Sequence, residues 1–219
     1  RNALRVGHEI LCRGESAVDA VEISVRSLED CPLFNAGRGS VFTSEGTIEM
    51  DAAIMDGHKG DAGSVAGVTT IKNPVSAARA VMEKSKHVFL IGKGADSFAA
   101  SQNLEIRDQE YFAVPSRWEQ LQQLKAQETT VSDHAFGNDR NVIHKFGTVG
   151  AVALDAAGHL AAATSTGGLA NKRFGRVGDS PLIGCGTFAN HLCAVSCTGH
   201  GEYFIRNVVA HSVACKFEF

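Results

Sequence analysis

Apolar residues recur at helical spacing in several stretches of the chain. Residues 15–30 place an apolar side chain at every third or fourth position, and Ser16 and Asp19 have the spacing of a capping box. Residues 73–85 form a second predicted helix, because Pro74 suits the first turn and apolar residues follow on one side. Three further helices are predicted over 1–16, 95–102 and 203–217.

Apolar runs bounded by turn residues predict strands. Short strands are expected at 87–92, which should be buried, and at 191–199. Both faces of the predicted strands are apolar, so the sheet must be covered on both sides. We therefore predict an α+β fold, with a layered αββα sandwich as an arrangement that fits. Two hairpins are predicted, one joining 47–57 to 62–71 and the other joining 148–155 to 160–166.

The periodic pattern dissolves between about residues 105 and 147. Residues 116–126 fit a helix, but the rest of this segment is polar, mixed in charge and without a period, which is typical of a mobile linker. Within residues 145–152, KFGTVGAV, the polar segment changes abruptly into one of the most apolar parts of the chain. The length of the chain fits a single domain over residues 1–219.

Composition and charge narrow the range of functions. The 219 residues are 44% hydrophobic and 21% charged, which is typical of a globular protein. A net charge of -3 gives no electrostatic basis for binding nucleic acid or an anionic membrane. No apolar run approaches the roughly 20 residues of a membrane span. The six cysteines include no CxxC pair and lie mostly in apolar runs, which favours reduced thiols and a cytoplasmic protein.

Two motif matches carry little weight. Cys193, Cys197 and His200 could form a zinc half-site, but alternate residues of a strand face the same way, so packing in the core is favoured. Gly184 and Gly186 begin a match to the dinucleotide-binding GxGxxG/A pattern, but no βαβ unit follows. We expect no cofactor for catalysis.

Threonine beside glycine at predicted strand ends is the strongest remaining signal. Thr148, Thr166 and Thr198 each adjoin a glycine, whereas Thr164 does not. At such places hydroxyls can converge and a ligand can approach the backbone closely. A threonine hydroxyl needs a base to remove its proton before it can attack. A threonine at the start of a chain has that base in its own α-amine, whose pKa is about 8.

From these residues alone, two interpretations stay open. Cleavage between Gly147 and Thr148 would make Thr148 both nucleophile and base, and a glycine before it offers no Cβ in the way of an N→O acyl shift. A hairpin strand that enters the core after a loop explains the same pattern without any chemistry.

Four long stretches resemble the isoaspartyl peptidase and plant-type L-asparaginase family, which is related to glycosylasparaginase. They are CPLFNAGRGSVFTSEGTIEMDAAIMDG, GTVGAVALDAAGHLAAATSTGG, NKRFGRVGDSPLIGCG and AVSCTGHGE. The resemblance implies a four-layer αββα sandwich of the N-terminal-nucleophile hydrolase type. It also implies a precursor that cleaves itself, giving an α subunit, 1–147, and a β subunit, 148–219, which assemble as a dimer of αβ units. The implied substrates are L-asparagine and β-aspartyl dipeptides, from which L-aspartate is released.

The resemblance also implies roles for single residues. Thr148 matches the nucleophile, and Thr166 matches a threonine that orients it. Arg176 and Asp179 match the pair that holds the α-carboxylate and the α-amine of the substrate, and an Arg fork does suit a carboxylate. The other matches are Thr198 and Gly199 as the oxyanion hole, Gly201 as a carbonyl near the substrate amine, and Asn35 as a residue near the nucleophile.

A structural sodium ion is the one bound ion that the resemblance implies. Its ligands are main-chain carbonyl oxygens, which suit a hard cation whatever the side chains are. The matching residues are Leu28, Glu29, Cys31, Phe34, Ala36 and Arg38.

The chain departs from the family pattern in three places. The family's first strand would precede residue 1, the residues after 211 do not match the family's C-terminal strands, and the stretch 189–196 is shorter than usual. We therefore expect a sandwich that lacks its first strand and its C-terminal strands. Two alternatives stay open: an inactive, truncated member that does not mature, and a glycosylasparaginase-like amidase, against which the cysteines argue.

Overall fold

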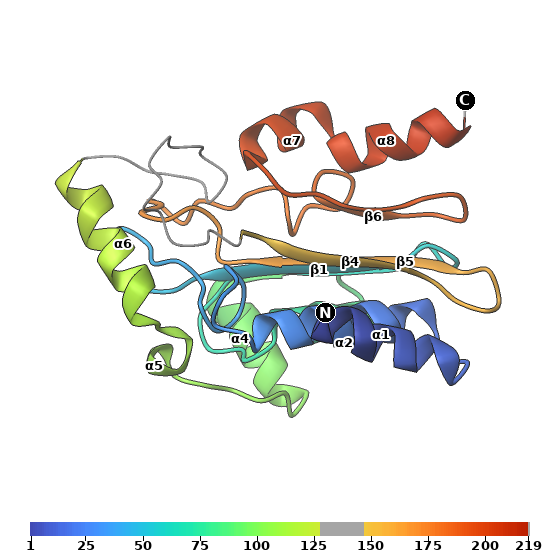
Figure 1. The fold of residues 1–219 in the computed structure, drawn as a ribbon, viewed down its shortest axis with the longest axis horizontal. Coiled ribbons are helices and arrows are strands. Elements are labelled where there is room, and N and C mark those ends of the chain that lie inside the picture. Colours follow the sequence, from blue (N-terminus) through green and yellow to red (C-terminus); the bar gives the residue numbers. More distant parts are fainter. Residues whose placement is uncertain (128–146, 219) are drawn as a thin grey trace.

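The chain folds around two β-sheets with helices on either side (Figure 1). The computed structural model describes residues 1–127 and 147–218. The larger sheet has the strand order β3-β2-β1-β5-β4, and the smaller sheet pairs β6 with β7. The strands are β1 Met50–Asp56, β2 Ala62–Val68, β3 Phe89–Ile91, β4 Val149–Leu154, β5 Leu160–Thr166, β6 Thr187–Ala189 and β7 Ala194–Ser196. The helices are α1 Asn2–Cys12, α2 Ala17–Glu29, α3 Pro74–Lys84, α4 Gly92–Ser101, α5 Gln109–Phe112, α6 Pro115–Ala126, α7 Gly201–Asn207 and α8 Val209–Glu218.

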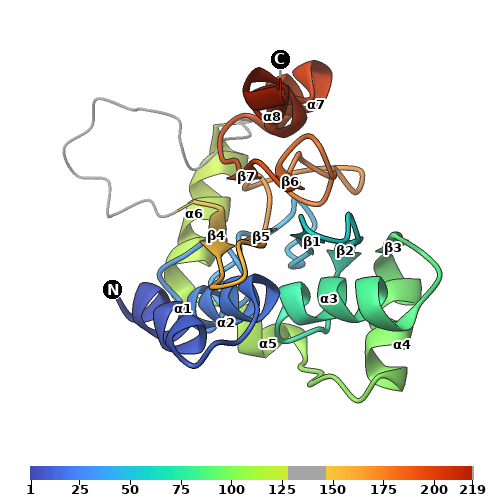
Figure 2. The ribbon, with the colours of Figure 1, turned by 90° about the vertical axis from the view of Figure 1, so that its right-hand side faces the viewer.

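Helices cover the outer side of each sheet. Helix α2 packs on β4 and β5, and α3 packs on β1 and β2, so both lie on one face of the larger sheet. The smaller sheet lies over the opposite face, and α7 and α8 lie beyond it (Figure 2). The order across the molecule is therefore helices α2 and α3, the larger sheet, the smaller sheet, and helices α7 and α8. Within the described residues, no helix is both long and apolar enough to cross a membrane.

Helix α2 starts at the capping box that the sequence predicts. The Ser16 hydroxyl accepts a hydrogen bond from the Asp19 N–H at 3.1 Å, and the Asp19 carboxylate accepts one from the Ser16 N–H at 3.2 Å. These contacts satisfy two backbone donors at the helix start. Val21 and Val25 are fully buried in the main core cluster, which fills the space between the helices and the larger sheet.

The two predicted hairpins are confirmed and lie side by side. Strands β1 and β2 are antiparallel, as are β4 and β5. Strand β1 also pairs with β5, so Asp51 lies opposite Thr166 and the two hairpins form one continuous sheet. This pairing brings the end of β5 and the start of β4 into the middle of the fold.

The two sheets approach each other closely beside the start of β4. A Cβ atom on Gly150 would overlap the Ser196 hydroxyl of β7, so only glycine permits this approach. The same serine hydroxyl lies 2.7 Å from the Thr164 hydroxyl of β5, which links the sheets by a hydrogen bond. The position of the strand that follows Thr148 is therefore set by sheet packing as well as by strand pairing.

Three sequence predictions need correction. The strand predicted at 87–92 is β3, but it is an exposed edge strand, with Ile91 68% exposed, rather than a buried one. The single helix predicted over 203–217 is divided into α7 and α8 by Val208, whose φ of 46° is left-handed. The strand predicted at 191–199 has only the three residues of β7, and its partner β6 was not predicted from the sequence.

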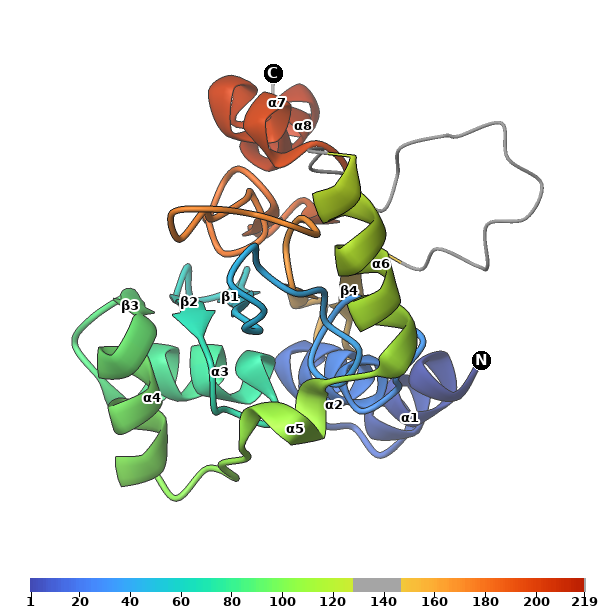
Figure 3. The ribbon, with the colours of Figure 1, turned by 90° about the vertical axis from the view of Figure 1, so that its left-hand side faces the viewer.

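The segment predicted as a mobile linker begins with regular structure. Helices α5 and α6 occupy its first part, and α6 agrees with the helix predicted at 116–126. Figure 3 shows α6 running from α5 along one side of the molecule. The Arg117 side chain of α6 donates a hydrogen bond to the Gly39 carbonyl at 2.9 Å, which ties the helix to the loop after α2. Residues 128–146 lie outside the described residues.

Candidate active site

Two threonine hydroxyls meet where β4 begins and β5 ends. Thr148 precedes the first residue of β4, and Thr166 is the last residue of β5. Their Oγ1 atoms lie 2.9 Å apart, because the antiparallel register places Val149 opposite Ser165. The Gly168 N–H donates to Thr166 Oγ1 at 3.0 Å, which fixes the orientation of that hydroxyl. Thr166 is therefore placed to orient the hydroxyl of Thr148.

Asn35 connects the loop after α2 to both of these strands. Its backbone N–H donates to the Gly147 carbonyl at 3.3 Å, and its carbonyl accepts from the Gly167 N–H at 3.0 Å. Its side-chain amide donates to the Gly168 carbonyl at 2.8 Å and accepts from the Val41 N–H at 2.9 Å. The side chain is buried, so all these bonds are shielded from water. Asn35 thus holds the carbonyl of the residue before Thr148.

Arg176 and Asp179 lie together beside Gly201. A Cβ atom on Gly201 would lie 2.9 Å from both Arg176 Nη2 and Asp179 Oδ1, so the absence of a side chain leaves room for these groups. Arg176 is bound by Glu202, whose Oε1 accepts from the Nε and Nη2 groups at 2.9 Å. Burial raises the pKa of the Asp179 carboxyl, although the nearby Arg176 opposes this shift. Among the described residues, Asp179 Oδ2 is buried without a hydrogen-bond partner.

A small cavity of about 20 Å³ collects most of the predicted site residues. This space is about that of one water molecule. Groups of opposite charge, Arg176 and Asp179, meet the two threonine hydroxyls here. The lining residues are Asn35, Thr148, Thr166, Gly168, Leu169, Arg176, Gly178, Asp179, Ser180 and Gly199.

Thr198 and Gly199 lie on two sides of Thr148. Gly199 lines the small cavity, whereas Thr198 is exposed and lines a wider groove between β4, β7 and α8, which Thr148 also borders. The predicted oxyanion-hole residues therefore both lie beside Thr148, Gly199 at the small cavity and Thr198 at the wider groove. Gly201, at the start of α7, completes the group through its contact with Arg176 and Asp179.

The loop after α2 brings several carbonyl groups together. The Glu29 carbonyl accepts from the Arg38 N–H at 2.7 Å, and the Cys31 carbonyl accepts from the Phe34 N–H at 3.3 Å. The carbonyl oxygens of Pro32 and Phe34 both crowd against Gly39, whose φ is 103°. A tight loop lined by carbonyl oxygens fits a hard monovalent cation better than a transition metal. The described residues contain no group of three or more His, Cys, Asp or Glu side chains that could hold a metal ion.

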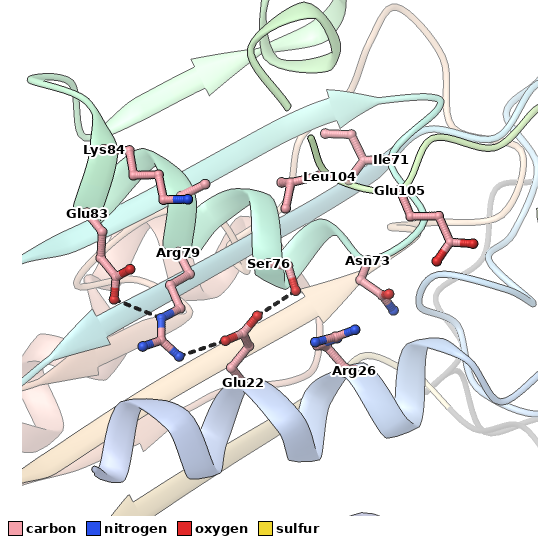
Figure 4. A pocket seen from close by; sticks show the side chains of 11 residues that line it. Glu22, Arg26, Ile71, Asn73, Ser76, Arg79, Glu83, Lys84, Leu104 and Glu105 are labelled. Carbon is pink, nitrogen blue, oxygen red and sulfur yellow. Dashed lines mark hydrogen bonds and ion pairs between the residues drawn. The ribbon is translucent and has the colours of Figure 1, made fainter. Parts of the chain in front are cut away.

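A second pocket, between α2 and α3, contains none of the predicted site residues (Figure 4). Its volume is about 210 Å³. Its central Arg79 is already bound by the carboxylates of Glu22 at 2.7 Å and Glu83 at 2.8 Å, and Ser76 donates to Glu22 at 2.6 Å. Because these four side chains already bind one another, they are poorly placed to bind a ligand in this pocket.

Glu202 was not among the residues predicted from the sequence. It sits directly after Gly201 in the TGHGE stretch, and its partner Arg176 is 26 positions earlier. The only sequence signal for Glu202 was its position directly after Gly201, a residue already predicted to belong to the site. The contact with Arg176 depends on the position of α7, which places the Glu202 side chain against Arg176.

Comparison with known proteins shows the family of the chain. A family model described as asparaginase matches residues 1–219 of the chain. The chain belongs to this asparaginase family. The resemblance drawn from the four sequence stretches is thereby confirmed, and the asparaginase-family relatives cover almost the whole of this chain.

Three curated relatives illustrate the similarity. The isoaspartyl peptidase of Escherichia coli (strain K12) is 52% identical over 217 residues, which are 99% of this chain and 67% of the relative. The plant-type L-asparaginase of Thermococcus kodakarensis is 48% identical over 98% of this chain and 70% of its own length. The isoaspartyl peptidase/L-asparaginase of Rattus norvegicus is 50% identical over 91% of this chain and 58% of its own length.

Proposed function

We propose that this asparaginase-family chain hydrolyses L-asparagine and β-aspartyl dipeptides, releasing L-aspartate, with Thr148 as the nucleophile. The 2.9 Å contact between the Thr148 and Thr166 hydroxyls, inside a cavity that also holds Arg176 and Asp179, is the observation that carries this proposal. The names of the relatives, isoaspartyl peptidase and L-asparaginase, support the same substrates.

Cleavage between Gly147 and Thr148 is part of the proposal. In the continuous chain the Thr148 nitrogen belongs to a peptide bond and cannot act as a base. For cleavage, Thr148 Oγ1 attacks the Gly147 carbonyl carbon, while the Asn35 N–H stabilises the negative charge that develops on the Gly147 oxygen. The C–N bond between Gly147 and Thr148 then breaks, and the hydroxyl proton passes to the departing Thr148 nitrogen. An N→O acyl shift followed by hydrolysis of the ester leaves a free α-amine on Thr148.

The hydrolytic steps follow from the same atoms. The Thr148 α-amine takes the proton of Oγ1, which attacks the side-chain carbonyl carbon of the substrate. Thr198 Oγ1 and the Gly199 N–H bind the oxyanion of the tetrahedral intermediate. The leaving amine takes the proton back and departs as ammonia or an amino acid. Water, activated by the same α-amine, then hydrolyses the aspartyl ester on Thr148 and releases aspartate.

Specificity for a free aspartyl end follows from Arg176 and Asp179. The Arg176 fork binds the α-carboxylate, and the carboxylate of Asp179 binds the α-ammonium, assisted by the Gly201 carbonyl. Asp179 Oδ2, which is buried and has no hydrogen-bond partner among the described residues, supports this role, because a buried acceptor favours a donor from a ligand. Ordinary α-peptides lack this pair of charged groups beside the scissile bond and would not be hydrolysed.

The same proposal covers assembly and ion binding. The observed order of helices and sheets supports a four-layer αββα sandwich of the N-terminal-nucleophile hydrolase type. We expect the two cleaved parts to stay together as an αβ unit, to pair as a dimer of such units, and to hold a sodium ion on the carbonyl-lined loop 28–38. All six cysteines are free, which supports a cytoplasmic enzyme over a disulfide-bonded, glycosylasparaginase-like one.

An assay of the purified chain with a β-aspartyl dipeptide, L-asparagine and the matching α-aspartyl dipeptide tests the proposal. Release of aspartate from the first two and not from the third is expected, and Thr148→Ala should abolish it. Activity that survives Thr148→Ala would refute the nucleophile. A wild-type chain without any activity would favour the inactive alternative.

A further inference from the structure

Glu29 buries a carboxyl group inside the fold, behind the threonine site. It is the last residue of α2, and its side chain is fully buried. Oε1 accepts one hydrogen bond from the Ser165 hydroxyl at 2.6 Å and another from the Val75 N–H at 3.0 Å. A charged side chain is rarely buried without a strong local reason. The hydrolytic mechanism proposed above uses neither this carboxyl nor the Ser165 hydroxyl.

The contact with Ser165 acts on the strand pair that carries the site. Ser165 immediately precedes Thr166 in β5, and it lies opposite Val149, the residue that follows Thr148. Because side chains alternate along a strand, Ser165 points to the helix side while Thr166 faces the cavity. The contact from Glu29 to Ser165 therefore restrains both threonines. Thr166 is restrained because it follows Ser165 in the chain, and Thr148 because its neighbour Val149 pairs with Ser165.

Glu29 also joins two further elements to this point. The Val75 N–H belongs to the first turn of α3, where backbone donors have no partner within the helix. The Glu29 carboxyl accepts from this N–H and so caps α3, although it lies 46 positions earlier in the chain. The Glu29 backbone carbonyl accepts from the Arg38 N–H at 2.7 Å, which closes the loop that carries Asn35. Strand β5, helix α3 and the Asn35 loop thus converge on one residue.

We propose that the side chain of Glu29 is a positioning residue, which holds Ser165 and thereby keeps the Thr148 and Thr166 hydroxyls at bonding distance. The inference rests on the proposed function for its kinetic consequences, but its geometry does not depend on that function. The side chain acts through one oxygen, Oε1. Glutamine has the same shape as glutamate and keeps an acceptor oxygen at the Oε1 position, so it is a close substitute.

Ser165→Ala tests the inference most selectively, because it removes the strand contact and leaves the cap on Val75 in place. Ser64→Ala is the matched control: Ser64 is almost as buried as Ser165 but lies in β2, which β1 separates from β5, and its hydroxyl has no hydrogen-bond partner among the described residues. We expect Ser165→Ala to slow chain cleavage and to lower kcat about tenfold, the worth of one buried hydrogen bond, with KM nearly unchanged. Ser64→Ala should leave both rates within about twofold of wild type.

Glu29→Gln and Glu29→Ala provide the second comparison. The glutamine keeps an oxygen at the Oε1 position, so it should retain the cleavage rate and kcat that the alanine loses. Equal losses in the two variants would overturn the role given to Oε1. If Ser165→Ala has the same cleavage rate and kcat as Ser64→Ala, the positioning role is overturned.

Amide hydrogen exchange separates this inference from the proposed function. Peptides from β4 and the end of β5 should exchange faster in Ser165→Ala than in Ser64→Ala, whether or not the chain is an active enzyme. If wild type is inactive but exchange rises in Ser165→Ala alone, the proposed function fails and the positioning role stands. Unchanged exchange in Ser165→Ala contradicts the positioning role even in an active enzyme.

Discussion

The hydroxyl oxygens of Thr148 and Thr166 lie 2.9 Å apart, although 18 positions separate the two residues in the chain. The β4–β5 hairpin brings them together, and the Gly168 N–H fixes the Thr166 hydroxyl. One hydroxyl is thus held by the fold, and the other is free to react. This relationship leads to the first prediction.

Thr166→Val removes the hydroxyl and keeps the shape of the side chain. We expect kcat to fall roughly 10- to 100-fold, with KM little changed, because the bond that orients Thr148 is lost while the substrate contacts remain. Thr166→Ser keeps the oxygen and should recover most of the rate. Steady-state kinetics on a β-aspartyl dipeptide gives both constants, and a Thr166→Val enzyme with wild-type kcat would contradict the role of Thr166.

Glu202 competes with the substrate for Arg176. The carboxylate of Glu202 already occupies the Nε and Nη2 edge of the guanidinium, which is proposed to bind the substrate carboxylate. Glu202→Gln should weaken that competitor and lower KM about threefold, a modest effect because Glu202 is about half exposed. Glu9→Gln, which disturbs the remote exposed pair with Arg5, is the control and should leave KM unchanged. A higher KM in Glu202→Gln would show that Glu202 assists binding instead.

Asp179 makes binding sensitive to acid. Burial raises its pKa, so the carboxylate takes up a proton at a higher pH than an ordinary aspartate does. The protonated form cannot pair with the substrate ammonium, so KM should rise as pH falls through this raised pKa. Measuring KM between about pH 4 and 8 locates the transition relative to the ordinary aspartate pKa of about 3.9. Asp179→Asn should have a high KM that no longer changes over this range, and a flat wild-type profile would argue against the ammonium contact.

Ser16→Ala should destabilise the fold without affecting the chemistry. It removes the hydroxyl that caps α2, which typically costs about 1 kcal/mol. Ser16→Thr retains the hydroxyl, which accepts from the Asp19 N–H and donates to the Asp19 carboxylate, and should keep most of the stability. Thermal unfolding measures the difference, and unchanged kcat and KM show that the site is intact. Equal stability of Ser16→Ala and wild type would mean that the capping box contributes little here.

The sequence allowed the local elements to be predicted well. The capping box at Ser16, the proline that begins α3 and the turns of the two hairpins are each encoded within a few residues. The break at Val208 was not predicted, because a valine rarely adopts a left-handed φ and nothing nearby signals it. Strand β6 was missed because three residues in a glycine-rich stretch form a strand only when β7 pairs with them.

The site was predictable only in part for a similar reason. Thr148 and its neighbours stand out beside glycines in the sequence, and the family motifs name Arg176 and Asp179. The side-chain contacts of Glu202 and Glu29 became visible only in the structure, because their partners Arg176 and Ser165 lie 26 and 136 positions away. No local pattern encodes such contacts.

The most direct test of the central claim is the mass of the purified full chain after prolonged incubation. The account predicts two fragments, 1–147 and 148–219, with Thr148 as the new N-terminal residue, and an intact chain for Thr148→Ala. A wild-type chain that stays intact, or one that is cut at another bond, would contradict the claim that Thr148 becomes an N-terminal nucleophile.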